Sequence, residues 1–288
     1  GSFVTIANTA TGTFTTSGTL NVDAQVRIDG GTLDFTGGSI IGSSNLWLTD
    51  VTANWPGALN GGVDGPRVMT LTRSVFNGST IAVGNVSQPA QWAWESSTVN
   101  ADVTVTGGLV LEGAQVTING RLDVPATYPS VIQSVGGSVL NVAGFGIDGA
   151  TFDNVSLAST GGTISGLDNV TFQNMDPTVT QLAVTHPGAA EPFVFDGLTF
   201  STVPTTGLYL SVTDDLADAN TLALEVTNST PADLSSATAT AGGATVTGGT
   251  ANPNLVSWIN ASGGLWSEPT NWSGGVVPSD GSDVEITL

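Results

Sequence analysis

Three aspartates crowd one short segment of the sequence and are the first candidates for ligand binding. Asp214, Asp215 and Asp218 would form an oxygen-rich loop, and Ca²⁺ takes carboxylate and carbonyl oxygens as its ligands. The spacing matches neither an EF-hand nor the repeats of calcium-binding β-rolls. Asp is also a common capping residue in turns. We therefore favour turn capping, and calcium is the one cofactor that the sequence leaves open.

A pair of tryptophans is the second candidate. Trp92 and Trp94 alternate along the chain, so their side chains share one face of a strand or a strand edge. If the pair is exposed, it can stack on sugar rings, which makes glycans a candidate partner. If it is buried, it fills the interior or closes an end, and this second interpretation is the one we favour.

The sequence offers little for catalysis. Its one histidine, His186, precedes a proline outside any recognisable catalytic motif, and the chain has no Cys and no Lys. A nucleophile needs an activating base beside it, and no such arrangement is found. The pair Asp214–Asp215 lacks the basic residues that polysaccharide lyases and hydrolases carry. We predict no catalytic residues and no enzymatic activity, with a polysaccharide lyase or hydrolase as the weakest alternative.

Charge and hydropathy narrow the range of partners further. The net charge is −20, with only 4 positive side chains. Such a surface repels phosphate backbones, which argues against nucleic acid as a partner. No apolar run is long enough to span a bilayer, so we expect no membrane insertion. The absence of Cys rules out a disulfide scaffold, and the hydrophobic core must supply the stability.

Short runs of alternating apolar residues, separated by Gly or Asn, recur along the chain. Residues 18–22, 31–35 and 101–106 are examples, and Val, Ile, Thr and Phe dominate them. This alternation is typical of strands with one buried face, and no stretch shows a helical period. The sequence therefore predicts an all-β fold.

The spacing of similar segments indicates how the strands are arranged. Residues 109–126 contain three six-residue units in succession, and Phe152, Phe172 and Phe200 recur in similar contexts. A period near 20 residues fits one coil of three short strands, with equivalent Phe side chains stacked inside and Asn side chains stacked at the turns. We predict a right-handed parallel β-helix, also called a β-solenoid. A β-sandwich is the alternative, disfavoured because the Asn-Gly and Asp-Gly pairs typical of tight hairpins do not dominate the turns.

We expect two regions in the chain. Residues 1–250 would form the β-helical rod, interrupted by loop insertions near 53–66, 86–96 and 176–192. Residues 251–288 would form a C-terminal segment that caps the rod or begins a next block.

The strings Gly-Thr-Leu-x-Val and Gly-Gly-Thr-Leu within residues 18–40, and the similar residues 107–124, resemble the pectin-lyase-like β-helices of bacterial surface proteins and autotransporter passengers. This resemblance implies a secreted or cell-surface location and an adhesive or structural role. The C-terminal pattern W-x(5)-W…P-x(4)-D-x-V-x-I is similar to a module that opens β-helical blocks in large bacterial extracellular proteins. By that resemblance Trp266, Trp272 and Pro278 would cap the stack.

Two terminal runs complete the set of candidate residues. Phe3, Val4 and Ile6 form an apolar run near the start, and the segment with Val284, Ile286 and Leu288 forms a matching one near the end. Terminal strands with unpaired backbone groups can accept another strand. We therefore predict a non-catalytic structural module that joins end to end, as a filament subunit or a tandem block. Its partners would be other copies of itself or adjacent repeat blocks.

Overall fold

The computed structural model describes residues 3–7, 12–17, 20–21, 25–36, 40–41, 45–61, 66–84, 90–186, 193–214, 222–248, 255–258, 260, 264–272, 277–278 and 283–286. Within these residues the secondary structure is almost entirely strand, which confirms the all-β class. Two 3-10 turns, η1 (Ser235–Ala237) and η2 (Pro269–Asn271), are the only helical elements among them.

The strands belong to one large sheet and two small ones. The 22-stranded main sheet contains β1 (Phe3–Ala7), β2 (Thr13–Thr16), β4 (Gln25–Phe35), β6 (Asn45–Asn54), β7 (Ala58–Asn60), β8 (Val68–Thr72), β9 (Val75–Val83), β10 (Ala90–Glu95), β11 (Thr98–Val105), β12 (Gly107–Glu112), β13 (Gln115–Val124), β14 (Ser130–Asp148), β15 (Ala150–Ser159), β16 (Ile164–Asp168), β17 (Thr171–Gln173), β18 (Thr180–His186), β19 (Phe193–Asp196), β20 (Thr199–Phe200), β21 (Leu208–Asp214), β22 (Ala223–Thr227), β23 (Thr238–Ala241) and β24 (Thr245–Gly248). The small sheets pair β3 (Leu20–Asn21) with β5 (Ile40–Ile41), and β25 (Leu255–Trp258) with β26 (Asp283–Ile286).

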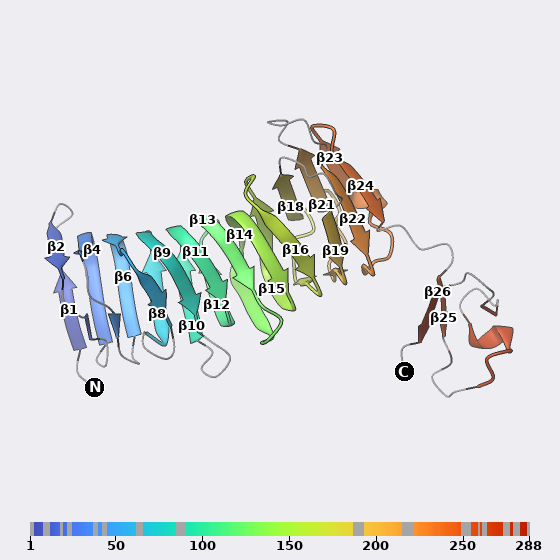
Figure 1. Cartoon of the computed structure of the whole chain (residues 1–288), viewed down its shortest axis with the longest axis horizontal. Helices are drawn as coiled ribbons and strands as arrows, with labels where there is room; N and C mark the ends of the chain where they lie inside the picture. Colours follow the sequence, from blue (N-terminus) through green and yellow to red (C-terminus); the bar gives the residue numbers. More distant parts are fainter. Residues whose placement is uncertain are drawn as a thin grey trace.

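The pairings of the main sheet form ladders along which strands from successive passes of the chain lie side by side. The first ladder includes β1, β4, β6, β8, β10 and β12, and the second includes β2, β4, β6, β9, β11 and β13. A third ladder begins with β7 and the later part of β9 and ends with β22 and β24. In Figure 1 the strands follow one another in chain order along the long axis, from β1 and β2 in blue to β22 and β24 in orange.

Long bent strands join the first two ladders. Residues 45–49 of β6 pair with β8 and residues 52–54 pair with β9, while β14 pairs with both β12 and β13. The neighbours therefore close into a ring of eight parallel strands, in the order β6, β8, β10, β12, β14, β13, β11, β9. In its hydrogen-bond connectivity this is a closed eight-stranded parallel barrel, and the remaining strands of the main sheet lie outside it.

This connectivity corrects the fold predicted from the sequence. The right-handed parallel β-helix was expected to have separate short strands in each coil, and the alternative was a β-sandwich. Both are overturned, because the pairing closes through bent strands and every pairing among the described strands is parallel, whereas a sandwich is antiparallel. The physical reason lies at the bends. Gly30 has a φ of 78° and Asp50 a φ of 55°, so β4 and β6 turn a corner without ending.

The core lies between the ladders and is built from the alternating apolar positions. Phe152, Phe172 and Phe200 are register partners on β15, β17 and β20. Their rings stack with centroids 5.2 Å apart at both steps, which confirms the predicted column of Phe side chains. Offset aromatic pairs of this kind add to the stabilisation from burial.

The predicted loop insertions are partly strands. Residues 90–95, placed in the loop near 86–96, form β10, and residues 180–186, placed in the loop near 176–192, form β18. Near 53–66, β7 interrupts the expected loop. The rest of these segments includes residues 62–65, 86–89 and 187–192, which lie outside the described residues. Among the residues that the structure describes, no helix is long and apolar enough to cross a membrane.

Candidate functional site: strand edges and stacked polar side chains

The first edge of the main sheet is formed by β1 and β2. Each of them pairs with β4 and, among the described strands, with no other. The predicted assembly residues Phe3, Val4 and Ile6 are the register partners of Gln25, Val26 and Ile28. The structure therefore places all three in a strand at the edge of the sheet.

The opposite edge is formed by β23 and β24. Within the described chain they pair only with β21 and β22 respectively. The predicted residues Val284 and Ile286 lie in β26, which is parallel to β25 in a separate sheet, in register with Val256 and Trp258. Leu288 lies outside the described residues. β26 thus has a single described partner, β25.

Two of the three predicted capping residues, Trp266 and Trp272, pack against each other. Trp272 is fully buried and its ring meets that of Trp266 edge to face at 4.5 Å. The Trp272 indole N–H donates to the backbone oxygen of Trp266 at 2.7 Å. Trp266 itself is 50% exposed, and Pro278 is partly buried. The two tryptophans of the W-x(5)-W pattern therefore form one packed unit, while their capping role stays a prediction.

The tryptophans predicted as sugar-stacking residues lie in the core. Trp92 and Trp94 have no exposed surface, and their ring centroids are 6.5 Å apart. The Trp92 indole N–H donates to the backbone oxygen of Pro66 at 3.2 Å. Because neither ring has a face in solvent, neither can stack on a sugar. The structure places both where the favoured interpretation put them, in the interior.

Of the three candidate calcium ligands, only Asp214 lies within the described residues. Asp214 ends β21, is 3% exposed, and accepts a hydrogen bond from the backbone N–H of Leu222 at 2.9 Å. Asp215 and Asp218 lie outside the described residues. Among the residues that are described, no group of three or more His, Asp or Glu side chains could hold a metal ion. Calcium binding therefore stays a prediction.

His186 is also buried, at the end of β18. Its register partner is Asp214, and its ring meets that of Phe193 edge to face at 4.6 Å. The loop position expected from the sequence is wrong, because the residue closes a strand. The imidazole is therefore buried and packed against an aromatic ring.

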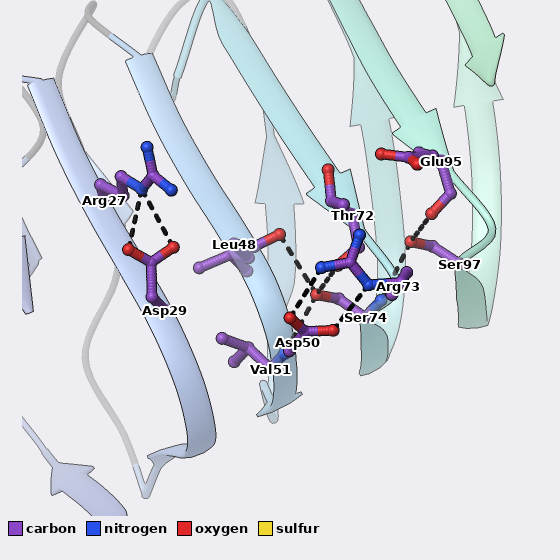
Figure 2. A network of polar contacts seen from close by, with 10 residues as sticks. All are labelled: Arg27, Asp29, Leu48, Asp50, Val51, Thr72, Arg73, Ser74, Glu95 and Ser97. Carbon is purple, nitrogen blue, oxygen red and sulfur yellow. Dashed lines mark hydrogen bonds and ion pairs between the residues drawn. The ribbon is translucent and has the colours of Figure 1, made fainter. Parts of the chain in front are cut away.

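Arginines are paired with aspartates on the face of the sheet. Arg73 binds Asp50 through two hydrogen bonds of 2.9 and 2.8 Å, and Arg27 binds the neighbouring Asp29 on its own strand, as Figure 2 shows. Arg121 pairs with Asp123 at 2.7 Å. The guanidinium of Arg73 holds the pKa of Asp50 below its ordinary value. Three of the 4 cations in the chain are thus bound to carboxylates of the same molecule.

Buried serines satisfy the backbone where the chain bends. The Ser74 hydroxyl accepts from the backbone N–H of Val51 at 3.1 Å and lies 2.9 Å from the carbonyl oxygen of Thr72 (Figure 2). The backbone N–H of Ser74 donates in turn to the hydroxyl of Ser97 at 3.1 Å. Each serine follows a residue with positive φ, Arg73 or Ser96. The hydroxyls therefore replace ladder bonds that the bend would leave unmade.

A row of asparagines runs across the second ladder. Asn54, Asn77, Asn100 and Asn119 each donate from the side-chain amide to the residue one pass earlier, and the row ends on the carboxylate of Asp34. The distances between amides are 2.7, 2.5 and 2.6 Å. The predicted stack of Asn side chains is therefore present, but its members lie in strands and not at turns. All the donated bonds point toward the charged acceptor at one end.

A row of aspartates on the third ladder was not predicted. Asp148, Asp168 and Asp196 are successive register partners on β14, β16 and β19. Burial, together with the charges of its two neighbours, raises the pKa of Asp168. Hydrogen bonds from Thr227 and Asn228 lower the pKa of Asp196. The signal in the sequence was an Asp followed each time by Gly or Asn, at residues 148–149, 168–169 and 196–197.

Replacing Asp168 by Asn is expected to stabilise the protein at neutral pH by about 0.5 kcal/mol, because like charges directly opposite each other repel. The value is small since the carboxylate remains partly open to solvent. The bond from the Asp196 N–H to Asp168 Oδ1, at 3.2 Å, can be kept by the amide oxygen. Urea unfolding as a function of pH measures the effect.

The sign of this effect follows from linkage. Because the folded-state pKa of Asp168 is raised, the wild type gains stability as pH falls through that pKa, and the advantage of Asp168→Asn should fade there. Asp176→Asn is the control with the opposite sign, since hydrogen bonds from Thr178 lower the pKa of Asp176. It should cost stability at neutral pH. An Asp168→Asn variant no more stable than wild type at pH 7 would contradict the prediction.

The comparisons with known proteins give no relative from which to transfer a function. No family model, no curated protein and no solved structure matches the chain.

Proposed function

We propose that this chain is a non-catalytic structural module that joins end to end with other copies of itself, or with adjacent blocks of the same kind, through β-strand addition outside the cell. The observation that carries the proposal is the pairing at the two edges. β1 and β2 at one edge, and β23 and β24 at the other, each have a described partner on one side only. Strands with unpaired N–H and C=O groups are templates for a further strand.

The chemistry of the described surface favours this role over the alternatives. Trp92 and Trp94 are buried and give no support to a carbohydrate-binding module. The predicted acidic pair of a lyase or hydrolase has one member, Asp214, that is buried and hydrogen-bonded to backbone. A net charge of −20 and a chain without Cys suit a soluble module that holds together by its core and its ladders.

Assembly should depend on protein concentration and on salt. Copies with a charge of −20 repel one another, and raising the ionic strength from about 0.01 M to 0.15 M shortens the Debye length from about 30 Å to 8 Å. We expect sedimentation velocity to show species larger than one chain, more of them at the higher ionic strength. Negative-stain electron microscopy should show these species as end-to-end rows.

The same measurement can overturn the proposal. A single monomeric boundary at every concentration and ionic strength would exclude end-to-end association. Side-by-side clusters in the micrographs would equally count against strand addition at the edges.

A further inference from the structure

We propose that the joint between copies pairs β26 of one copy with β1 of the next, in parallel, with Val284 opposite Val4 and Ile286 opposite Ile6. This proposal rests on the proposed function, and it adds the register and names β26, in place of β23 and β24, as the strand that meets β1 of the next copy. It follows from three features of the described strands: the apolar pattern of the first ladder, the direction in which strands are added, and the charges that would meet.

The first ladder repeats one apolar pattern at every step. Two apolar residues separated by one other residue face the core in β4, β6, β8, β10 and β12, and the pairs are Val26 and Ile28, Leu46 and Leu48, Met69 and Leu71, Trp92 and Trp94, and Leu109 and Leu111. Each of these ten residues is the register partner of a residue in a neighbouring pair, as in Val26 with Leu46 and Leu48 with Leu71.

Both strands of the proposed joint have the same spacing of apolar residues in sequence. In β1 it is Val4 and Ile6, which are in register with Val26 and Ile28. In β26 it is Val284 and Ile286, in register with Val256 and Trp258 of β25. Joining β26 to β1 in the stated register would add the apolar residues of β25 and β26 of one copy to the first ladder of the next.

The direction of addition is also consistent. In β4, β6, β8, β10 and β12, each strand has the earlier strand of the chain on one side and the later strand on the other, always parallel. β26 has β25 as its earlier neighbour. β1 has β4 as its later neighbour. A parallel contact between β26 and β1 therefore gives each strand the kind of neighbour that it lacks among the described residues.

The alternation of apolar and polar residues along both strands excludes a register that is shifted by one residue. A shift by one residue would set Glu285 opposite an apolar position of β1, and burial of an unpaired carboxylate is costly. In the proposed register Asp283 is opposite Phe3 and Glu285 is opposite Thr5. No two acidic residues meet across the joint, which matters in a chain of charge −20.

A cysteine cross-link tests this register directly, because the chain has no Cys of its own. In the double variant Thr5→Cys with Glu285→Cys, the two positions of neighbouring copies would be about 4.8 Å apart, within the range of a disulfide. Under mild oxidation at the ionic strength that favours assembly, we expect a ladder of covalent dimers, trimers and longer species on a non-reducing gel. Adding a reductant should cleave the disulfides and leave only the band of the single chain.

The matched control moves one cysteine by two residues. With Thr5→Cys and Asp283→Cys the separation becomes about 8 Å, too long for a disulfide without backbone movement. This variant should form at least ten times less cross-linked product. Thr5→Cys alone should stop at dimers.

The outcomes separate the register from the function. If the wild-type chain assembles but Thr5→Cys with Glu285→Cys gives no ladder, the register is wrong while end-to-end assembly stands. A stronger ladder from the Asp283→Cys control would also overturn the register, in favour of a two-residue shift. A wild-type chain that stays monomeric would overturn both.

Discussion

Replacing Phe172 by Ala is expected to lower the free energy of unfolding by about 3–5 kcal/mol, the range for removing a buried aromatic side chain. Phe172 has no exposed surface and lies in the middle of the column, with Phe152 and Phe200 each 5.2 Å away. The substitution leaves a cavity between two rings and removes both stacking contacts. Urea or thermal unfolding followed by circular dichroism measures the loss.

Two control variants test whether the lost stability comes from the buried aromatic ring. Phe172→Leu keeps most of the buried volume and should cost clearly less than Phe172→Ala. Val135→Ala removes an aliphatic side chain that is 95% exposed and should change stability by less than about 0.5 kcal/mol. Equal losses for Phe172→Ala and Val135→Ala would mean that the Phe column does not carry the stability assigned to it.

Replacing Gly144 by Ala should also have a large effect, for a different reason. Gly144 lies within β14, where the neighbouring pass of the chain approaches closely. An added Cβ would lie 2.7 Å from the backbone nitrogen of Thr163 and closer still to its carbonyl oxygen. Backbone atoms cannot move aside as a flexible side chain can, so we expect a loss of about 1–3 kcal/mol.

Gly136→Ala is the matched control for that substitution. Gly136 lies on the same strand, and an added Cβ would meet nothing within 4 Å. This variant should unfold at the same denaturant concentration as the wild type, while Gly144→Ala unfolds earlier. If both variants unfold at the same denaturant concentration, the close approach of the Thr163 backbone is not the reason that position 144 requires glycine.

The sequence was sufficient to predict the all-β class and many of the strands, because their alternation reflects burial directly. Val26, Ile28, Leu46 and Leu48 are all buried at the alternating positions. The column of Phe side chains was predictable for the same reason, since repeated Phe residues in similar contexts became register partners. The row of Asn side chains followed from Asn recurring where runs end.

The closure of the ladders could not be predicted, because it depends on backbone angles at a few residues. Gly30 and Asp50 look like turn residues that end a strand, yet each lies inside one. The pairs formed by Arg73 with Asp50 and by Ser74 with Ser97 join residues 23 apart in sequence. Such contacts are visible only once the register is known. The apolar pattern within β10 was interpreted as part of a loop that also contains Gln88 and Pro89.

The parallel direction of the strands has a consequence for the symmetry of any joined assembly. Two copies related by a twofold axis would bring identical edges together, which makes the strands at the contact antiparallel. A parallel contact instead joins two different edges, so it is heterologous and leaves one free edge of each kind after every addition. The assembly would therefore have two different ends and could grow at either of them. The contact itself would set no limit to its length.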